Sequence, residues 1–348
     1  MKNILIQNRR IGYNEPVFII AEAGVNHNGK LDLALKLVDA AASAGADAVK
    51  FQTFRAEQVV TESGEMVEYQ KKNLGKVESQ IEMLRKLEFD ESWYPQVIAH
   101  CKKMGIIFLS TPHGSFASVD LLKDFSVPAF KFGSGDLTSL PLLTYAAKLG
   151  KPMILGTGMA TMAEVKEAVK TIKKAGGDKI IVLHCTTNYP CPSEEINLRA
   201  MQTMMKELNV LVGYSDHTNG SQVAVMATSL GACVIEKHLT LDNNLPGPDH
   251  RTSSNRIDFK KMVDEVRAVN IILGSAIKKP TESEKKLLVI RRSIVAVRDI
   301  KKGERFTRNN LDIKRPANGL APKYFDKVLG KRAKKYIKRG TLLNRNLI

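Results

Sequence analysis

Long apolar runs are absent from this sequence. None reaches the ~18 residues that a bilayer-spanning helix needs. The first ten residues, MKNILIQNRR, also lack the longer apolar stretch of a secretory signal. We therefore expect a cytoplasmic protein that makes no use of a membrane.

Cysteines are few and none of them forms a CxxC pair. This pattern gives no sign of a disulfide framework. Because cysteine is among the residue types most often found inside proteins, we expect four buried free thiols. They are Cys101, Cys185, Cys191 and Cys233.

Acidic residues are outnumbered, and the formal net charge is +17. From residue 280 onward, twenty Lys or Arg stand against six Asp or Glu. Nucleic acid or another anionic surface is one interpretation of such a segment. The segment has few aromatic residues to stack on bases and no nucleic-acid-binding motif. A solvated, lysine-rich surface is therefore favoured, and no nucleic-acid partner is expected.

The first 275 residues alternate between short apolar runs and amphipathic stretches of helical period. The stretches 31–46 and 162–177 are typical of helices, since apolar residues recur at i, i+3, i+4 and i+7 and glycine follows. Eight strand–helix units predict a (β/α)8 barrel, because eight strands in about 260 residues fit it better than a doubly wound open sheet. The expected strands are 17–24, 48–54, 106–112, 129–135, 152–158, 180–186, 210–217 and 233–240.

The end of the chain has a different organisation. Residues 273–286 are charged and contain a proline, which indicates a linker. IKKGERFTRNN (300–310) and IKRGTLLNRNL (337–347) form an internal repeat, with 312–320 between them as a predicted loop. Two copies are too few for a solenoid, so we expect a small β-rich domain. The predicted division is 1–275 for the barrel, 276–287 for the linker and 288–348 for the small domain.

Each expected strand ends in a polar residue. In a barrel these ends meet at the C-terminal mouth, where active sites lie. The series predicts an active site there rather than eight ordinary turns. The terminal residues are Glu22, Gln52, Thr111, Ser134, Thr157, Thr186, His217 and His238.

His217 and His238 end two successive strands, which favours a shared metal ion over two structural histidines. Two protein ligands leave coordination positions open for a substrate oxygen. Glu22 is a natural general base. Lys50 and Lys131 lie in apolar strands, where they could form a Schiff base, bind the anionic groups of a substrate, or extend to the barrel rim. Ser134 and Thr157 are flanked by glycines that would let backbone N–H groups approach an anion.

Several motifs occur in the order found in one known family. They are FIIAEAGVNHNG, VKFQTF, FLSTP, FKFGSGD, GTGM, LHCTTNYP, GYSDHT, ACVIEKHLTLD, GPDH and KRPANG. The chain resembles the sialic acid synthases, whose members make N-acetylneuraminate, legionaminate or pseudaminate. The resemblance covers nearly the whole chain and includes a C-terminal antifreeze-like (SAF) domain. It implies a TIM barrel with a small β-rich domain, in a homodimer whose small domains are swapped.

The resemblance also implies a reaction. Phosphoenolpyruvate and an open-chain N-acetylated hexose condense with water and release phosphate, with Glu22 as the base and Mn²⁺, or Mg²⁺ or Co²⁺, held by His217 and His238. The residues implied for phosphoenolpyruvate are Lys50, Thr111, Lys131, Ser134 and Ser215. Those implied for the sugar are Gln52, Tyr189, Asp249 and, from the partner subunit, Arg315.

Two positions depart from the family pattern. Some relatives have Ser at Gly156 and Asn at Thr187, so Thr157 or Asn188 could take over an anion contact. The motifs HCTT, FQTF and GPDH resemble the legionaminate branch, which leaves open whether the sugar is N-acetylmannosamine or a 6-deoxy diacetamido analogue. No role is assigned in the loop 55–80. A Schiff-base aldolase using Lys131 and a non-catalytic glycan-binding protein are the alternatives.

Overall fold

The computed structural model describes residues 2–64, 66 and 79–348. Part of the loop 55–80, to which no role is assigned, lies outside these residues. The described chain divides into two compact units, Met1–Gly274 and Ser275–Ile348. No helix in the described ranges is long and apolar enough to cross a membrane.

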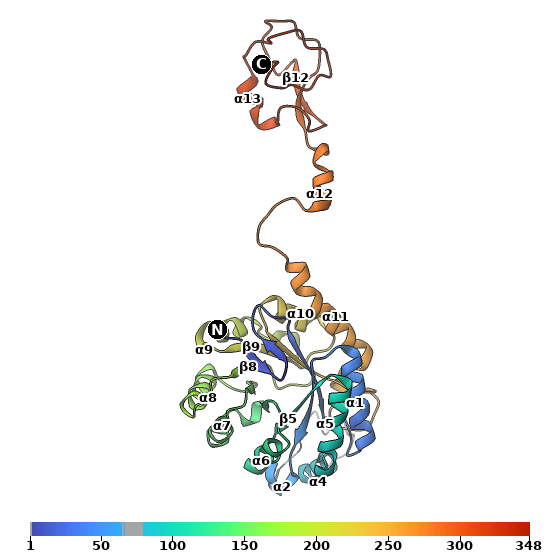
Figure 1. The fold of residues 1–348 in the computed structure, drawn as a ribbon, viewed down its shortest axis with the longest axis vertical. Helices are drawn as coiled ribbons and strands as arrows, with labels where there is room; N and C mark the ends of the chain where they lie inside the picture. Colours follow the sequence, from blue (N-terminus) through green and yellow to red (C-terminus); the bar gives the residue numbers. More distant parts are fainter. Residues whose placement is uncertain (1, 65, 67–78) are drawn as a thin grey trace. The chain divides into compact units, whose positions relative to one another are not determined.

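The first unit is a parallel (β/α)8 barrel, and all eight expected strands are confirmed (Figure 1). The hydrogen-bonded order is β5-β4-β3-β10-β9-β8-β7-β6, and β5 packs beside β6 to complete the ring. The strands are β3 (Phe18–Gly24), β4 (Ala48–Thr53), β5 (Ile107–Pro112), β6 (Phe130–Phe132), β7 (Met153–Gly156), β8 (Ile180–His184), β9 (Leu211–Asp216) and β10 (Val234–His238).

A helix follows every strand and covers the outside of the barrel. The helices expected at 31–46 and 162–177 are confirmed as α1 and α8. Gly45 ends α1 in the left-handed region, at φ 87°. The outer helices are α1 (Leu31–Ala44), α5 (Tyr94–Met104), α6 (Phe116–Asp124), α7 (Leu140–Ala147), α8 (Met162–Lys174), α9 (Arg199–Leu208), α10 (Gln222–Ser229) and α11 (Arg256–Leu273), with the short α2 (Ala56–Val59) and α4 (Gln80–Arg85) before α5.

An N-terminal hairpin that the sequence pattern did not predict precedes the barrel. Its strands, β1 (Ile4–Ile6) and β2 (Arg9–Ile11), have only three residues each, too few to show a period. Ile4, Ile6 and Ile11 pack into the same apolar cluster as the inward-facing residues of the barrel strands. The hairpin thereby buries apolar side chains of the barrel interior that would otherwise meet water.

The second unit pairs the two repeat copies with each other. Ile300 and Ile337, the first residues of the copies, exchange backbone hydrogen bonds of 2.8 and 2.9 Å. A two-stranded antiparallel sheet completes it, formed by β11 (Ser293–Ala296) and β12 (Leu311–Lys314). The expected loop 312–320 therefore begins only at Arg315, because 312–314 belong to β12. A further short helix is α13 (Phe325–Val328).

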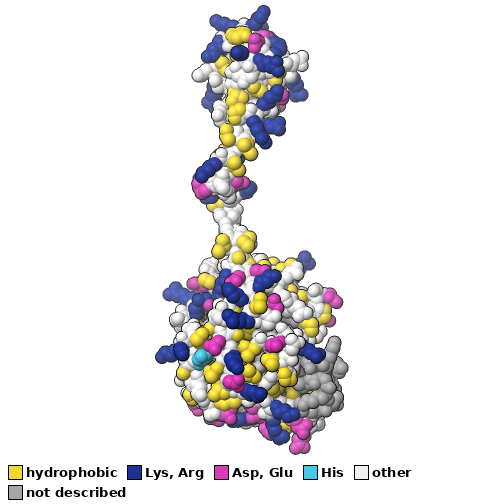
Figure 2. Space-filling view, turned by 90° about the vertical axis from the view of Figure 1, so that its right-hand side faces the viewer, with side chains coloured by type: hydrophobic (Ala, Val, Ile, Leu, Met, Phe, Trp, Pro, Cys, Tyr) yellow, Lys and Arg dark blue, Asp and Glu magenta, His cyan; other side chains and the backbone are white. Residues whose placement is uncertain are grey.

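The segment expected as a linker contains a short helix, α12 (Glu282–Lys286). Thr281 and Glu284 form a capping box at its start, which supplies partners for the first backbone N–H groups. The net charge is concentrated in this second unit, which has 22 of the 53 Lys and Arg but only 6 of the 36 Asp and Glu. Figure 2 shows Lys and Arg side chains spread over its surface.

Candidate active site

Strand alternation decides which side chains enter the barrel. In β3, Phe18 and Ile20 belong to the interior cluster and Ile19 and Ala21 to the layer beneath the helices, so Glu22 points inward. By the same alternation, polar side chains at the ends of the other strands also point into the barrel. The inward residues are Lys50 and Gln52 on β4, Thr111 on β5, Lys131 on β6, Ser215 on β9 and Glu236 and His238 on β10, all of which line one pocket with Glu22.

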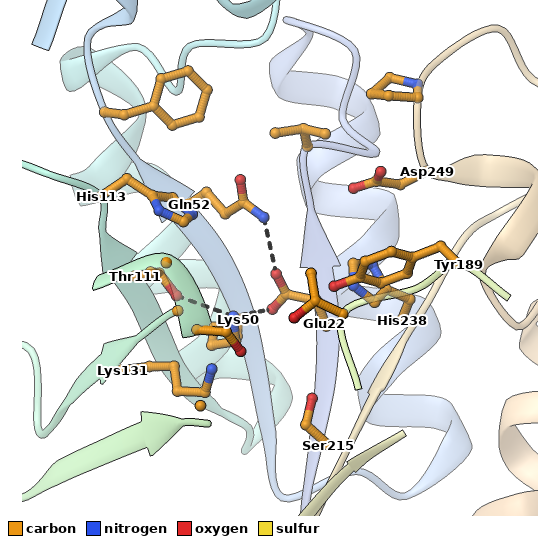
Figure 3. A pocket seen from close by; sticks show the side chains of 18 of the residues that line it. Glu22, Lys50, Gln52, Thr111, His113, Lys131, Tyr189, Ser215, His238 and Asp249 are labelled. Atoms are coloured by element: carbon orange, nitrogen blue, oxygen red, sulfur yellow. Dashed lines mark hydrogen bonds and ion pairs between the residues drawn. The ribbon is translucent and has the colours of Figure 1, made fainter. Parts of the chain in front are cut away.

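Glu22 lies at the centre of this pocket (Figure 3). Its strand neighbours in register are Lys50 and His238. One carboxylate oxygen of Glu22 forms an ion pair with Lys50, and the other accepts a hydrogen bond of 3.2 Å from Gln52. Lys50 also donates to Thr111 Oγ1 at 3.0 Å. Burial raises the pKa of Glu22, and the opposing charge of Lys50 does not cancel this rise.

Glu236 is a site residue that the sequence analysis did not assign. It is buried beside both lysines, with Lys131 Nζ 3.3 Å from Oε1 and Lys50 Nζ 3.9 Å from Oε2. Ser215 Oγ donates to it at 3.1 Å. Burial alone would raise the pKa of Glu236, but Lys131 and Lys50 outweigh it and lower the pKa to about 2. The signal was its place two residues before His238, which puts both on the same face of the strand.

The neighbour of Glu236 in sequence faces the other way. Lys237 points outward and forms a buried ion pair of 2.7 Å with Asp216. Lys237 Nζ also donates to Thr218 O at 2.6 Å. This second cluster of charge at the same strand ends is structural, since it ties β10 to the turn after β9.

His217 and His238 lie in the same pocket, with ring centroids 5.8 Å apart. His217 Nδ1 lies 2.6 Å from the backbone oxygen of Thr186, which fixes the ring and leaves Nε2 as the nitrogen that could bind a metal. Burial lowers the pKa of both histidines, so both favour the neutral form that binds metals. Within 2–64, 66 and 79–348, no group of three or more His, Cys, Asp or Glu is arranged for a metal. Two neutral imidazoles that line one pocket are a donor set that could hold an ion whose other ligands are water or substrate.

Close backbone approach shapes the side of the pocket near Ser134. Gly158 N donates to Ser134 Oγ at 2.9 Å, and a Cβ on Gly158 would lie 2.1 Å from Thr187 Oγ1. Thr187 and Cys185 line the pocket here, and neither was assigned from the sequence. Thr157 does not reach it, because its hydroxyl donates to Leu183 O at 2.9 Å.

Asn188 likewise lies outside the pocket lining, with its amide 3.4 Å from Glu195 Oε2. Neither Thr157 nor Asn188 is thus placed to replace an anion contact. Thr187, in contrast, lines the pocket beside Gly158.

The three residues expected to bind the sugar from the barrel all line the pocket (Figure 3). Tyr189 Oη lies 3.2 Å from His217 Nε2. Burial, and then the nearby charge of Glu22, raise the pKa of Asp249 to about 7. The fourth expected residue, Arg315, is exposed in the second unit. The eleven other residues to which the family resemblance gives a role all line this pocket.

Comparison with known proteins shows the family of this chain. The NeuB family model matches residues 37–278. The chain belongs to the NeuB family. The SAF domain model matches residues 291–346, which confirms the predicted C-terminal domain. As a member of this family of synthases, the chain is an enzyme, and the alternative of a non-catalytic glycan-binding protein is wrong.

Relatives of this NeuB protein match along almost their whole lengths. An N,N'-diacetyllegionaminic acid synthase of Campylobacter jejuni is 47% identical over 93% of this chain and 98% of its own. One of Legionella pneumophila is 42% identical over 97% of each chain. The crystal structure of an N-acetylneuraminic acid synthetase from Leptospira borgpetersenii, in complex with citrate, has a TM-score of 0.72 and 33% identity, covering 82% of this chain and 95% of that one.

Proposed function

We propose that this enzyme is a nonulosonic acid synthase that condenses phosphoenolpyruvate with an open-chain N-acetylated hexose and water and releases phosphate. The observation that carries this proposal is that two lysines, a buried carboxylate and two histidines line one pocket. They are Lys50, Lys131, Glu22, His217 and His238. The named activities of the relatives support the same class of reaction.

Cations and hydroxyls at one end of the pocket hold phosphoenolpyruvate. The phosphate and the carboxylate are bound by charge-assisted contacts, which are about twice as strong as neutral hydrogen bonds. C3 of phosphoenolpyruvate forms a bond to the sugar aldehyde carbon, and C2 is left as a cation. Glu22 takes one proton from the water that adds to C2. The C2–O bond to the phosphate group then breaks and C2 becomes a ketone, while the two protons of the water end on the former aldehyde oxygen and on the released phosphate. The holding residues are Lys50, Thr111, Lys131, Ser134 and Ser215.

Gln52, Tyr189 and Asp249 hold the sugar in this proposal, and His217 and His238 hold a divalent ion, with Mn²⁺ first and Mg²⁺ or Co²⁺ as alternatives. The ion supplies Lewis-acid polarisation of the sugar carbonyl. Chelation should abolish phosphate release, and adding Mn²⁺ should restore it. Full turnover in a metal-free preparation would contradict the requirement.

A Schiff base on Lys131 is disfavoured by its surroundings. Burial alone would lower the pKa of Lys131, but the charges of Glu236 and Glu22 outweigh it and raise the pKa above the usual value. Lys131 Nζ also donates to Phe132 O at 3.2 Å. An amine must lose its proton to attack a carbonyl, so this lysine suits anion binding instead. Borohydride should therefore trap no covalent adduct with either substrate.

The sugar is proposed to carry a free 6-hydroxyl or a 6-deoxy group. Phosphate release should be measured with phosphoenolpyruvate alone and with three sugars: N-acetylmannosamine, its 6-phosphate, and 2,4-diacetamido-2,4,6-trideoxymannose. Release should require a sugar, and kcat/KM should be lowest with the 6-phosphate. A preference for the 6-phosphate overturns the sugar assignment. Release that needs no sugar, or none with any sugar, overturns the reaction.

A further inference from the structure

His113 is a pocket residue to which the reaction above gives no role. It follows β5 and lines the pocket, with 29% of its side chain exposed. Figure 3 shows Lys131 and Ser215 at one end of the pocket, Glu22 and Lys50 in the middle, and Gln52, Asp249 and His113 at the other end. In this view His113 lies level with Gln52 and Asp249, two of the residues assigned to the sugar.

The ring of His113 lies beside a buried carboxylate. Its Nδ1 lies 3.4 Å from Asp136 Oδ2, while Asp136 Oδ1 accepts a hydrogen bond from Gly114 N at 3.3 Å. In the described part of the chain, Asp136 Oδ2 is buried and accepts no hydrogen bond. The carboxylate thus favours a proton on His113 Nδ1, because nothing else there competes for it.

Two further contacts set the orientation of this ring. A Cβ on Gly133 would lie 3.2 Å from His113 Cε1, so a larger residue would crowd the ring on that side. The ring of Phe54 packs against His113 edge-on, with centroids 6.3 Å apart. Nε2, the other ring nitrogen, makes no hydrogen bond within the described residues, and the ring that carries it lines the pocket, so a ligand there can reach it.

We propose that His113, oriented by Asp136, is a specificity-determining residue that accepts a hydrogen bond through Nε2 from an N–H or hydroxyl of the N-acylated sugar. The proposal rests on the function proposed above. It assigns His113 to the sugar and not to phosphoenolpyruvate, whose groups are all acceptors and would need a donor.

The test compares H113A, H113Q and the matched control H100Q. His100 Nε2 lies 2.7 Å from Asp39 Oδ1, and neither residue lines the pocket. His100 is therefore a second histidine paired with an aspartate, but away from the substrates. H113A should raise KM for the sugar about tenfold, the value of one hydrogen bond, and leave KM for phosphoenolpyruvate within about twofold. H113Q should recover much of the loss, since its amide oxygen reaches the position of Nε2. H100Q should match the wild type.

An equal or larger rise in KM for phosphoenolpyruvate would overturn the proposal, and so would unchanged values for both substrates. If the wild type turns over no sugar, the proposed function fails separately. Saturation-transfer NMR of the same three sugars with wild type and H113A then tests whether His113 contacts the sugar. Binding lost only in H113A supports it, whereas equal binding, or no binding to the wild type, overturns it.

Discussion

At the scale of single residues, the pocket pairs each positive side chain with a carboxylate. Lys50 contacts both Glu22 and Glu236, and Lys131 contacts Glu236. An anionic substrate must therefore enter a site whose cations already have partners. Glu22 and Glu236 differ in what surrounds them: the pKa of Glu22 is raised and that of Glu236 is lowered. The carboxylate with the raised pKa is the one suited to accept a proton.

E22Q should fold normally and still bind phosphoenolpyruvate, because the amide is nearly isosteric with the carboxylate. It cannot take a proton from water, and loss of a general base lowers kcat by about 10²–10⁴-fold. Steady-state phosphate release gives kcat, and isothermal titration gives the affinity for phosphoenolpyruvate. If E22Q keeps more than about a third of the wild-type kcat, another group is the base.

E236Q should be less stable than the wild type, but bound phosphoenolpyruvate should stabilise it more. Removing one partner of a buried ion pair costs about 3–5 kcal/mol, because Lys131 is left buried without its counter-charge. Phosphoenolpyruvate can supply that charge, so it should raise the melting temperature of E236Q more than that of the wild type. Thermal unfolding with and without phosphoenolpyruvate measures both effects. Equal shifts in the two proteins would mean that Glu236 does not neighbour the bound anion.

At the scale of elements, an irregularity at the end of β3 sets the position of the Glu22 carboxylate. The register between β3 and β4 shifts between Glu22 and Gly24, and Gly24 has φ 53°. A Cβ on Gly24 would lie 3.2 Å from Glu22 Oε1 and 3.4 Å from Gln52 Nε2. The irregularity thus occurs where the base and a sugar-side residue need space, as bulges near active sites often do.

G24A should lose activity beyond its effect on stability. Gly105, which ends α5, also has a left-handed φ, of 70°, but a Cβ added to it would meet no atom within 4 Å. G24A and G105A should both lose about 1 kcal/mol through backbone strain. Only G24A should lower kcat, by at least about tenfold, since it displaces Glu22. Urea unfolding and phosphate release check the two effects, and equal kcat in the two variants would contradict the role given to Gly24.

At the scale of the whole molecule, the family resemblance implies a site that needs residues of both units. The pocket lies in Met1–Gly274, whereas Arg315 lies in Ser275–Ile348. A guanidinium is always charged and presents a planar fork of donors that suits a sugar acyl oxygen or hydroxyl. A small domain joined by an extended segment can exchange between subunits at little energetic cost. We therefore expect a homodimer in which Arg315 serves the partner's barrel.

Arg315→Ala and H217A should each be nearly inactive alone, yet regain activity when unfolded and refolded together. A swapped mixed dimer has one site with both lesions and one with neither. About half the dimers should be mixed, so roughly a quarter of the wild-type activity should return. Each variant refolded alone is the control, and native mass spectrometry counts the mixed dimers. If mixed dimers form and no activity returns, Arg315 serves its own barrel.

The sequence by itself determined the barrel and most of the pocket. Eight apolar runs with polar ends are enough to predict eight strands, because a parallel strand must be apolar on both faces except where it leaves the sheet. Side chains that end such strands share one rim, so residues as distant in sequence as Glu22 and His238 could be assigned to one site before any contact was known.

Only the tertiary structure decided which neighbours those residues have. The side chain of Thr157 donates to a backbone carbonyl, whereas those of Glu236 and His113 line the pocket. The sequence shows only that these positions at the barrel rim are polar. Strand register and packing determine which way each side chain points. The three-residue strands of the N-terminal hairpin are too short for a periodic signal, and what holds them is burial against the barrel interior. Patterns along the chain reveal which segments meet, whereas pairing of charges and hydrogen bonds depends on distances that only the folded chain creates.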